Sequence, residues 1–377
     1  MKEEKKVKPK TLAEVMANCK TLGIIADGKD VDVVSTGSLT LDIATGIYGY
    51  PRGKIVEIFG PESGGKTTMA LVAIAQAQKM GKKAAFIDLE ATLNHKWAQK
   101  LGVDTDALIH IVPDYGEQAL DLVIDLIKTN EFDIIVIDST AALAPKSELL
   151  RTMEEQSMGT LARLMSKAMP KLTQIASKTK TTIVFISQVR EKIGVMFGNP
   201  EVSTGGRALK FFSSMRMRVN VVTKPDAKSG PTAEEGNHIK VKVIKNKCAK
   251  PHLEAEFFLN YEKGIDNDRE ILFAGVEKGI ITLDGRTYTF EKWEAVGKER
   301  MIKLIQDTPE LKASLLEKVK HSMASSSPVA VVDEEVTLED IEEAASISNK
   351  TIEQEMEEEE AADKKKMRVG KGVADED

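Results

Sequence analysis

The sequence predicts an α/β protein built on a mostly parallel β-sheet, and the alternation of two kinds of segment carries this prediction. Short apolar segments of strand length alternate with longer segments of helical periodicity. This alternation is typical of parallel strands whose connecting helices cover both faces of the sheet. We expect strands at 54–59, 84–88, 134–138 and 182–187, and the clearest helix at 66–79.

The composition is that of an ordinary globular protein. Of the 377 residues, 42% are hydrophobic and 30% are charged, and the length suggests two or three domains. No run of about 18 apolar residues exists, so we expect no membrane contact. The lysine-rich start lacks the apolar stretch of a secretory signal. Only Cys19 and Cys248 occur, too few for a disulfide framework or a zinc cluster, which favours a reducing, cytoplasmic compartment.

Changes of pattern along the chain indicate four parts. Residues 1–33 show apolar residues at helical spacing and form a small arm, and residues 34–265 hold the alternating strands and helices. A smaller α+β segment follows at 266–325. Residues 326–377 have few aromatic and many charged side chains, a composition for which we expect disorder.

Charge is distributed unevenly between body and tail. The net charge is −6, but residues 333–377 hold 17 Asp and Glu against 6 Lys and Arg, a net of −11, which leaves +5 for residues 1–332. An acidic tail of this kind can serve solubility alone. It can also compete with a polyanion for a mildly basic body. Charge by itself leaves both interpretations open.

The strongest chemical motif is a phosphate-binding loop between an expected strand and an expected helix. Its glycines allow the backbone to wrap a phosphate with N–H groups, and the helix that follows adds a positive dipole end. Lys66 would reach the β- and γ-phosphates, and the Thr67 hydroxyl would hold Mg²⁺. The loop reads Gly60-Pro61-Glu62-Ser63-Gly64-Gly65-Lys66-Thr67, and Thr68 follows it.

Polar residues end the expected strands next to this loop. Asp138 closes an apolar run, a position where a carboxylate is the usual partner of Mg²⁺. Glu90 lies just beyond the strand 84–88 and is our candidate for the base that deprotonates an attacking water, although Asp88 is equally available. Gln188 follows the strand 182–187, and its uncharged amide suits contact with a γ-phosphate better than proton transfer.

Several segments of the sequence resemble the bacterial RecA recombinase family. The resemblance runs from about residue 35 to 320, and the stretch KIGVMFGNP with the TGG that follows it is specific to that family. The segments are STGSLTLDIATG at 35–46, PRGKIVEIFGPESGGKTT at 51–68, KIGVMFGNP at 192–200 and TGGRALK at 204–210.

This resemblance implies a RecA-type P-loop NTPase core with a small N-terminal arm for polymerisation and a small C-terminal domain. It implies ATP and Mg²⁺ as cofactors, and filaments that form on single-stranded DNA and exchange strands with a homologous duplex. Such proteins act in DNA repair and in the SOS response to DNA damage, which adds a LexA-like repressor as an expected partner.

Nucleotide residues can be transferred from the family position by position. Lys66 and Thr67 match the phosphate and Mg²⁺ residues, Glu90 the catalytic base and Asp138 the Mg²⁺-associated carboxylate. Gln188 matches the residue that links the γ-phosphate to DNA. Three further nucleotide contacts and two lysines that reach a neighbouring subunit's ATP are implied; they are Asn94, Trp97, Tyr261, Lys245 and Lys247. The two lysines lie two apart in a strand-like run, so we expect their side chains to face one way and to stabilise γ-phosphate charge.

Two loops correspond to the family's DNA-binding loops, at 151–158 and 189–206. Cationic side chains would bind the phosphodiester backbone without sequence preference. Apolar side chains would wedge between bases, or would anchor the loops to the core. Paired glycines would let the backbone approach phosphates closely. The expected DNA residues are Met158, Arg163, Arg190, Lys192, Ile193, Met196, Phe197, Gly198, Asn199, Gly205, Gly206 and Arg207.

The sequence departs from the family pattern at several of these places. Gly64 replaces a serine of the phosphate loop, and Asn94 and Trp97 replace an aspartate and a tyrosine beside the adenine. Pro170 replaces an arginine near DNA, with Lys171 adjacent. At the second DNA site an arginine pair is replaced by Asn220 and Val221, while Lys240 and Lys242 keep positive charge there.

Two rival functions are compatible with the core motifs. One is a ring-forming motor or helicase built on the same core, which the KIGVMFGNP loop disfavours. The other is an ATP-switched DNA-binding scaffold that does not hydrolyse ATP, which Glu90, Lys245 and Lys247 disfavour.

Overall fold

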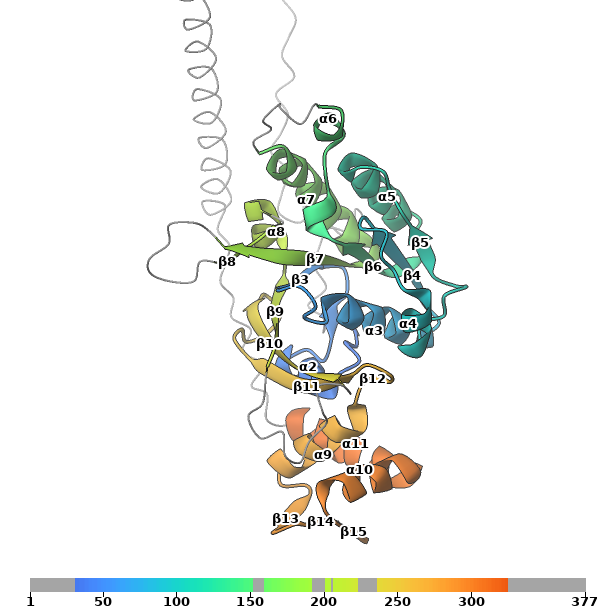
Figure 1. The fold of residues 1–377 in the computed structure, drawn as a ribbon, viewed down its shortest axis with the longest axis vertical. Coiled ribbons are helices and arrows are strands. Elements are labelled where there is room, and N and C mark those ends of the chain that lie inside the picture. Colours follow the sequence, from blue (N-terminus) through green and yellow to red (C-terminus); the bar gives the residue numbers. More distant parts are fainter. Residues whose placement is uncertain (1–30, 152–158, 192–200, 205, 223–235, 325–377) are drawn as a thin grey trace, which may run out of the picture. The chain divides into compact units, whose positions relative to one another are not determined.

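The computed structural model describes residues 31–151, 159–191, 201–204, 206–222 and 236–324 (Figure 1). Most of the expected arm and all of the expected tail lie outside the described residues. No helix among the described residues is both long enough and apolar enough to cross a membrane.

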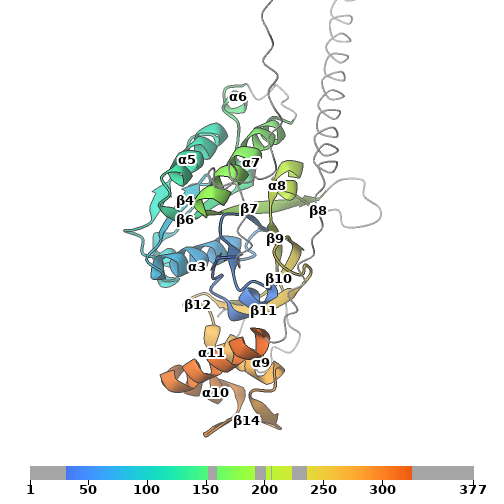
Figure 2. The same cartoon turned by 180° about the vertical axis from the view of Figure 1, so that it is seen from behind.

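One large sheet organises the described residues, as the same ribbon seen from behind also shows (Figure 2). Its strand order is β12-β11-β10-β9-β3-β7-β6-β4-β5, with β8 beside β7. The strands from β9 to β5 run parallel, whereas β10, β11 and β12 continue the sheet antiparallel. The predicted α/β fold with a mostly parallel sheet is confirmed. The strands are β3 (Ile55–Gly60), β4 (Lys83–Asp88), β5 (Ile109–Ile111), β6 (Phe132–Asp138), β7 (Thr182–Glu191), β8 (Glu201–Ser203), β9 (Met215–Val221), β10 (Gly236–Asn246), β11 (Glu254–Asn260) and β12 (Gly264–Ile265).

Helices cover both faces of this sheet because successive strand residues alternate between two apolar clusters. In β3, Val56 and Ile58 pack with α3 on one face, while Ile55 packs with α5, α7 and α8 on the other. The helices of this part are α2 (Leu39–Ala44), α3 (Lys66–Lys79), α4 (His95–Lys100), α5 (Gly116–Lys128), α6 (Lys146–Leu149), α7 (Thr160–Thr179) and α8 (Gly206–Phe212), with a 3₁₀ turn η1 (Thr140–Ala142) and a short β1–β2 pair (Val33–Val34 and Tyr50–Pro51).

The expected helix 66–79 coincides with α3, whose limits have local causes. Gly65, at φ 84°, precedes the first residue, and Gly81, at φ 73°, follows the last turn. Both conformations favour glycine because a Cβ is strained there. The expected strand 182–187 is too short. β7 continues to Glu191, because residues 189–191 pair antiparallel with β8 and form a hairpin at the base of the second expected DNA loop.

Parallel pairing brings the carboxyl ends of the central strands to one edge. Gly60 of β3 pairs with Gln188 of β7, and Asp88 of β4 pairs with Asp138 of β6. The phosphate loop and the predicted polar residues therefore share one edge of the sheet, where open α/β sheets bind ligands.

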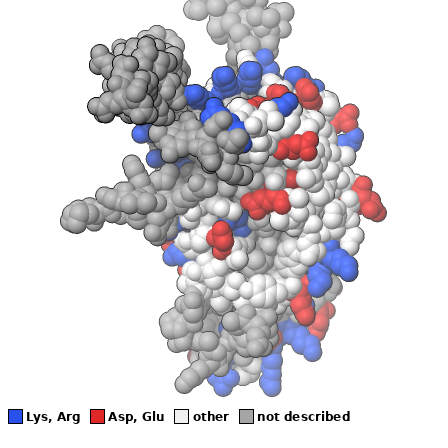
Figure 3. Space-filling model, turned by 45° about the horizontal axis from the view of Figure 1, so that its top comes forward, with Lys and Arg blue, Asp and Glu red and all other residues white. Residues whose placement is uncertain are grey.

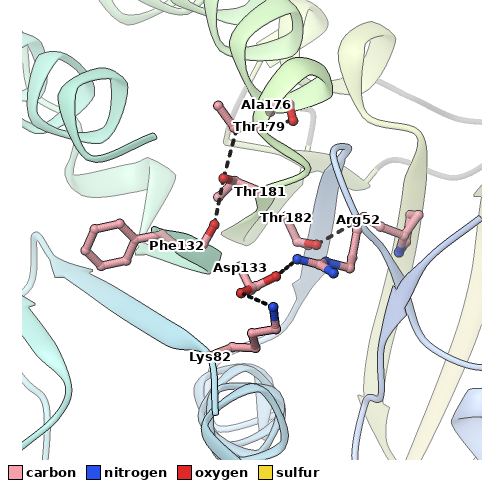
Figure 4. Close-up of polar contacts among 9 residues, drawn as sticks. Arg52, Lys82, Phe132, Asp133, Ala176, Thr179, Thr181 and Thr182 are labelled. Atoms are coloured by element: carbon pink, nitrogen blue, oxygen red, sulfur yellow. Dashed lines mark hydrogen bonds and ion pairs between the residues drawn. The ribbon is translucent and has the colours of Figure 1, made fainter. Parts of the chain in front are cut away.

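The C-terminal ends of α3, α5 and α7 lie at the opposite edge of the sheet (Figure 4). Buried Asp133 at the start of β6 forms an ion pair with Arg52, and Lys82 lies 3.8 Å from its other oxygen. Nearby Lys178 and Lys180 are exposed at the end of α7. Cations suit the negative ends of helix dipoles, so these side chains stabilise the fold at this edge.

A smaller cluster of helices and strands follows β12. It contains α9 (Asn267–Glu277), α10 (Lys298–Asp307) and α11 (Pro309–Ala324), with a three-stranded sheet of β13 (Thr282–Asp284), β14 (Thr287–Phe290) and β15 (Trp293–Val296). Its apolar core centres on residues such as Leu272, Met301 and Leu315, and it includes Leu39 of α2.

Glu270 joins this smaller cluster to α2. Its carboxylate accepts hydrogen bonds from the Ser38 hydroxyl (2.5 Å), the Leu39 amide (2.9 Å) and the Thr40 hydroxyl (2.6 Å). The side chain is buried, and burial raises the pKa of Glu270 to about 7, although these three donors oppose the rise. A buried carboxylate therefore holds α9 against the N-terminus of α2.

We expect Glu270→Gln to remove a pH dependence from stability. Because the folded-state pKa of Glu270 lies above the ordinary glutamate pKa of 4.5, the native state binds more protons than the unfolded state between those two values. Stability then falls as pH rises from about 4.5 to about 7, by on the order of 3 kcal/mol for this one group. Urea unfolding between pH 5 and 8 should show a shallower fall for Glu270→Gln. The control is Glu277→Gln on the exposed side of α9, which should keep the wild-type slope, and an unchanged slope in both variants would contradict the assignment.

Candidate active site

The phosphate loop has the backbone geometry that a phosphate requires. Ser63 and Gly65 take left-handed conformations, at φ 55° and 84°, which turn successive amides toward one point. A Cβ at Gly60 would lie 2.2 Å from the carbonyl oxygen of Val219, so only glycine fits there. The loop residues Pro61, Glu62 and Ser63 are exposed, whereas Gly64 is buried.

Lys66 sits at the start of α3 with its ammonium turned back into the loop. Its Nζ donates to the carbonyl oxygens of Gly60 (3.1 Å) and Pro61 (2.6 Å). Burial lowers the pKa of Lys66, and the nearby carboxylates of Asp138, Glu62 and Glu90 oppose that shift. This cation is therefore held where the loop would wrap a phosphate.

The donor set beside the loop fits a divalent cation. The Thr67 hydroxyl donates to Asp138 Oδ2 at 2.6 Å, which brings the two expected Mg²⁺ residues together. Burial raises the pKa of Asp138 to about 6, and the Glu90 and Asp88 carboxylates add to the rise. Excess negative charge around a hydroxyl and a carboxylate is an environment that favours Mg²⁺.

Glu90, the predicted base, and Asp88, the alternative that residue spacing leaves open, have different surroundings. Asp88 is buried and accepts hydrogen bonds from the amides of Thr92 (3.2 Å) and Leu93 (2.9 Å), with the His110 ring 3.2 Å away. Its oxygens hold the loop after β4 in shape. Glu90 is exposed, so its carboxylate has room for a water molecule.

Glu90 is reached by side chains from two neighbouring strands. Its Oε1 accepts a hydrogen bond from the Ser139 hydroxyl, after β6, and lies 3.4 Å from the Gln188 amide nitrogen of β7. Gln188 comes directly before the hairpin that leads to the second expected DNA loop. The predicted base and the predicted γ-phosphate residue are thus in contact.

The residues expected around the adenine lie beside α3 and α4. The Trp97 indole nitrogen donates to the Thr68 hydroxyl at 3.3 Å, which places the ring next to the phosphate loop helix. Asn94 caps α4, because its Oδ1 accepts from the Trp97 amide at 3.0 Å. Tyr261 is exposed in the turn after β11, and Gly264 beyond it lies against Leu101 at the end of α4.

The sequence suggested that Lys245 and Lys247 project together from one strand, but only Lys245 lies within β10. The pairing of β10 with β9 is irregular between Val243 and Lys245, and β10 ends at Asn246. Lys245 Nζ donates to the carbonyl oxygens of Lys210 (2.8 Å) and Phe211 (2.9 Å), where it caps the C-terminus of α8, while Lys247 is exposed. Burial lowers the pKa of Lys245 to about 8, and the nearby Lys247 adds to that shift.

Few of the expected DNA residues fall within the described residues. Arg163 is exposed on α7, and Gly206 and Arg207 begin α8, which packs against α7. No Asp or Glu occurs in α7. Figure 3 brings the end of the molecule that carries α5, α6 and α7 forward and shows Lys and Arg gathered near its upper edge. Arg190 lies in β7, and its side chain is not described. The remaining expected positions lie outside the described residues; they are Met158, Lys192, Ile193, Met196, Phe197, Gly198, Asn199 and Gly205.

The lysines at the expected second DNA site form ion pairs with neighbouring glutamates. Lys240 forms ion pairs with Glu254 (2.7 Å) and Glu256 (3.6 Å), and Lys242 pairs with Glu254 at 3.0 Å. The two lysines are present at this site as expected, but both are engaged by glutamates of β11. Antiparallel pairing of β10 with β11 sets the lysines directly opposite the glutamates, a register that the sequence does not reveal.

Hydroxyl side chains form a network that the sequence did not single out. Thr140 Oγ1 donates to Ser187 Oγ at 3.0 Å and lies 2.8 Å from Thr204 Oγ1. Ser139 contacts Glu90, as described above. The sequence signal for these four hydroxyl residues was weak, because small polar residues are common at the ends of strands and loops.

Comparisons with known proteins identify the family of this chain. The family model described as RecA N-terminal domain matches residues 16–266. Protein RecA of Mesoplasma florum is 50% identical over 276 residues, 72% of this chain and 80% of that protein. Protein RecA of Acidothermus cellulolyticus is 48% identical over 294 residues, 78% of this chain and 84% of that protein.

A longer match and a solved structure complete the comparison. Protein RecA of Streptomyces rimosus is 46% identical over 316 residues, 84% of this chain and 82% of that protein. The crystal structure of the RadB recombinase has a TM-score of 0.47 and 22% identity, and covers 62% of this chain and 98% of that chain. From the family model and the relatives, this chain belongs to the RecA family, the recombinase family that its motifs resemble.

Proposed function

We propose that this protein is a DNA-dependent ATPase that assembles on single-stranded DNA and catalyses homologous pairing and strand exchange. The observation that carries the proposal is the contact between Glu90 and Gln188 beside the phosphate loop, at the base of the β7–β8 hairpin. This contact links an expected catalytic base directly to an expected DNA-binding segment. Membership of the RecA family supports the same function.

ATP would be bound by the backbone of residues 60–67, with Lys66 on the β- and γ-phosphates. The Thr67 hydroxyl and the Asp138 carboxylate would hold Mg²⁺, whose charge would offset that of the phosphates. Trp97 would stack on the base from beside α3.

Glu90 would orient and deprotonate the water that attacks the γ-phosphate. Its exposure supports this role over Asp88, whose oxygens are engaged by backbone amides. Gln188 would sense the γ-phosphate and report it to the second DNA loop.

Lys245 and Lys247 would act on the ATP of a neighbouring subunit, so that the site lies between protomers of a filament. Lys247 is exposed, so a neighbouring subunit could contact it. Lys245 donates to the carbonyl oxygen of exposed Phe211 at the end of α8. Movement of Lys245 toward a phosphate would release the carbonyl oxygens that it caps.

Single-stranded DNA would be bound near the ends of α7 and α8, where Arg163 and Arg207 supply charge for the phosphate backbone. The homologous duplex would be captured more weakly, because Lys240 and Lys242 are engaged by Glu254 and Glu256. We further propose a cytoplasmic location and a LexA-like repressor as partner, both on family membership.

Two rival functions make different experimental predictions. The family match disfavours a ring-forming motor, which would give closed rings on DNA rather than helical filaments in electron micrographs. A non-hydrolysing scaffold would bind ATP without turning it over. Steady-state ATP hydrolysis, measured with and without single-stranded DNA, separates that scaffold from our proposal: we expect turnover to depend strongly on DNA, and no turnover in either condition would contradict us.

A further inference from the structure

Thr140 occupies a junction between the catalytic edge of the sheet and the end of the second expected DNA loop. It is the first residue of η1, two residues after Asp138, and its side chain is fully buried. Its hydroxyl lies between Ser187 at 3.0 Å, on β7, and Thr204 at 2.8 Å, just after β8.

The three hydroxyls have a consistent direction of hydrogen bonding. Each hydroxyl carries a single donor hydrogen, so if Thr140 donates to Ser187, its oxygen must accept from Thr204. Thr204 is fixed further, because its amide donates to the Gln188 carbonyl oxygen at 3.0 Å. Thr204 therefore connects the end of the expected DNA loop to two catalytic segments, one through its backbone and one through its hydroxyl.

On its other side, Thr140 is joined by one peptide bond to Ser139, whose hydroxyl donates to Glu90. Ser139, Thr140 and Ser187 are buried and Thr204 is half-buried, so the junction is shielded from water on every side except that of Thr204. Any displacement of Thr204 would leave the Thr140 oxygen without its donor inside the protein. The cost of that loss ties the position of Thr204 to the position of the Ser139–Thr140 backbone.

We propose that Thr140 is a positioning residue that couples DNA at the second loop to Glu90, by the route Thr204–Thr140–Ser139–Glu90. This inference rests on the proposed function, in which DNA at that loop stimulates hydrolysis by Glu90. The route is separate from that of Gln188, because Gln188 reaches the Glu90 side chain directly and Thr140 reaches it through the backbone of Ser139. Both routes end at the same atom, Oε1 of Glu90.

The decisive variant is Thr140→Val, which removes the hydroxyl and keeps the branched shape. A hydrogen bond of ordinary strength corresponds to about a five-fold change in an equilibrium constant. We expect the ratio of DNA-stimulated to DNA-free turnover to fall by about that factor or more. The gain in single-stranded DNA affinity caused by a non-hydrolysable ATP analogue should also shrink, because both ligands act through the same contact. Linkage then requires that the gain in analogue affinity caused by DNA shrink by the same factor. Thr140→Ser, which keeps the hydroxyl, should restore both.

Thr181 offers a matched control at the opposite edge of the same sheet. It is also fully buried, and its hydroxyl donates to the Phe132 carbonyl oxygen at 2.7 Å. Thr181→Val should lose comparable thermal stability while it keeps the wild-type stimulation ratio and the wild-type effect of nucleotide on DNA affinity. A merely structural role for Thr140 predicts the same behaviour for both variants.

The outcomes separate this inference from the function on which it rests. If wild-type turnover is stimulated by DNA and Thr140→Val is stimulated equally, with unchanged reciprocal coupling, the inference is overturned and the proposed function stands. If wild-type turnover does not respond to DNA, both are overturned. Should Thr140→Val fail to fold, Thr204→Val removes the same hydrogen bond from its other end, and an unchanged ratio there also overturns the inference.

Discussion

Glu90→Gln should lose ATP turnover by roughly 10²-fold or more while it still binds ATP and DNA, because an amide cannot accept the proton of the attacking water. The substitution keeps the size of the side chain and an oxygen that can accept from Ser139 and Gln188. Steady-state hydrolysis on saturating single-stranded DNA measures the loss. Nucleotide binding, measured by titration, should stay near the wild-type affinity.

Asp88→Asn is the matched control for this prediction. Its amide oxygen can still accept one backbone hydrogen bond, but its NH₂ group would face the second donor amide, so we expect a destabilised loop after β4. Thermal stability should therefore fall more than turnover per folded molecule. Loss of hydrolysis in Asp88→Asn with little effect in Glu90→Gln would reverse the assignment.

Filaments that mix two inactive proteins should regain activity if the two lysines act across the subunit interface. Lys245→Ala/Lys247→Ala protein keeps an intact phosphate loop, and Lys66→Ala protein keeps intact lysines. In a head-to-tail filament of equal parts, about a quarter of the interfaces would combine both intact halves. ATP turnover on single-stranded DNA should rise toward that fraction of wild type, whereas each protein alone stays inactive.

The structure adds a requirement to this experiment. Lys245 caps α8 within its own protomer, so its loss also weakens the end of that helix. Lys247→Ala alone should therefore be tested in the same mixture, since exposed Lys247 makes no such contact through its side chain among the described residues. Absence of rescue in both mixtures, in filaments seen to contain both proteins, would argue against a shared site.

Local sequence signals predicted the parts of the fold that depend on local chemistry. The helix expected at about 66–79 coincides with α3, whose ends lie next to Gly65 and Gly81. The end of β7 was not predicted, because its last residues are mostly polar and form a strand only through pairing with β8. A polar strand in a hairpin has no apolar pattern to reveal it.

The site residues also divide into those that local sequence predicts and those that depend on strand pairing. The phosphate loop could be predicted because its motif contains its own geometry, and the contact of Thr67 with Asp138 follows from strand order. Residue spacing left Asp88 and Glu90 both available, so the choice of Glu90 rested on the family resemblance. Which carboxylate the loop amides engage is set only in the folded protein. The irregular pairing before Lys245 and the pairing of Lys240 with Glu254 arise from the register of β9, β10 and β11, which is set only in the folded protein.

The most direct test of the central claim is a three-strand exchange reaction between circular single-stranded DNA and a homologous linear duplex, with and without ATP. Our account predicts joint molecules and displaced linear strand only when ATP and Mg²⁺ are present and the duplex is homologous. Rapid DNA-stimulated ATP hydrolysis without any exchanged product would contradict it and would assign the chain to a different use of the same core.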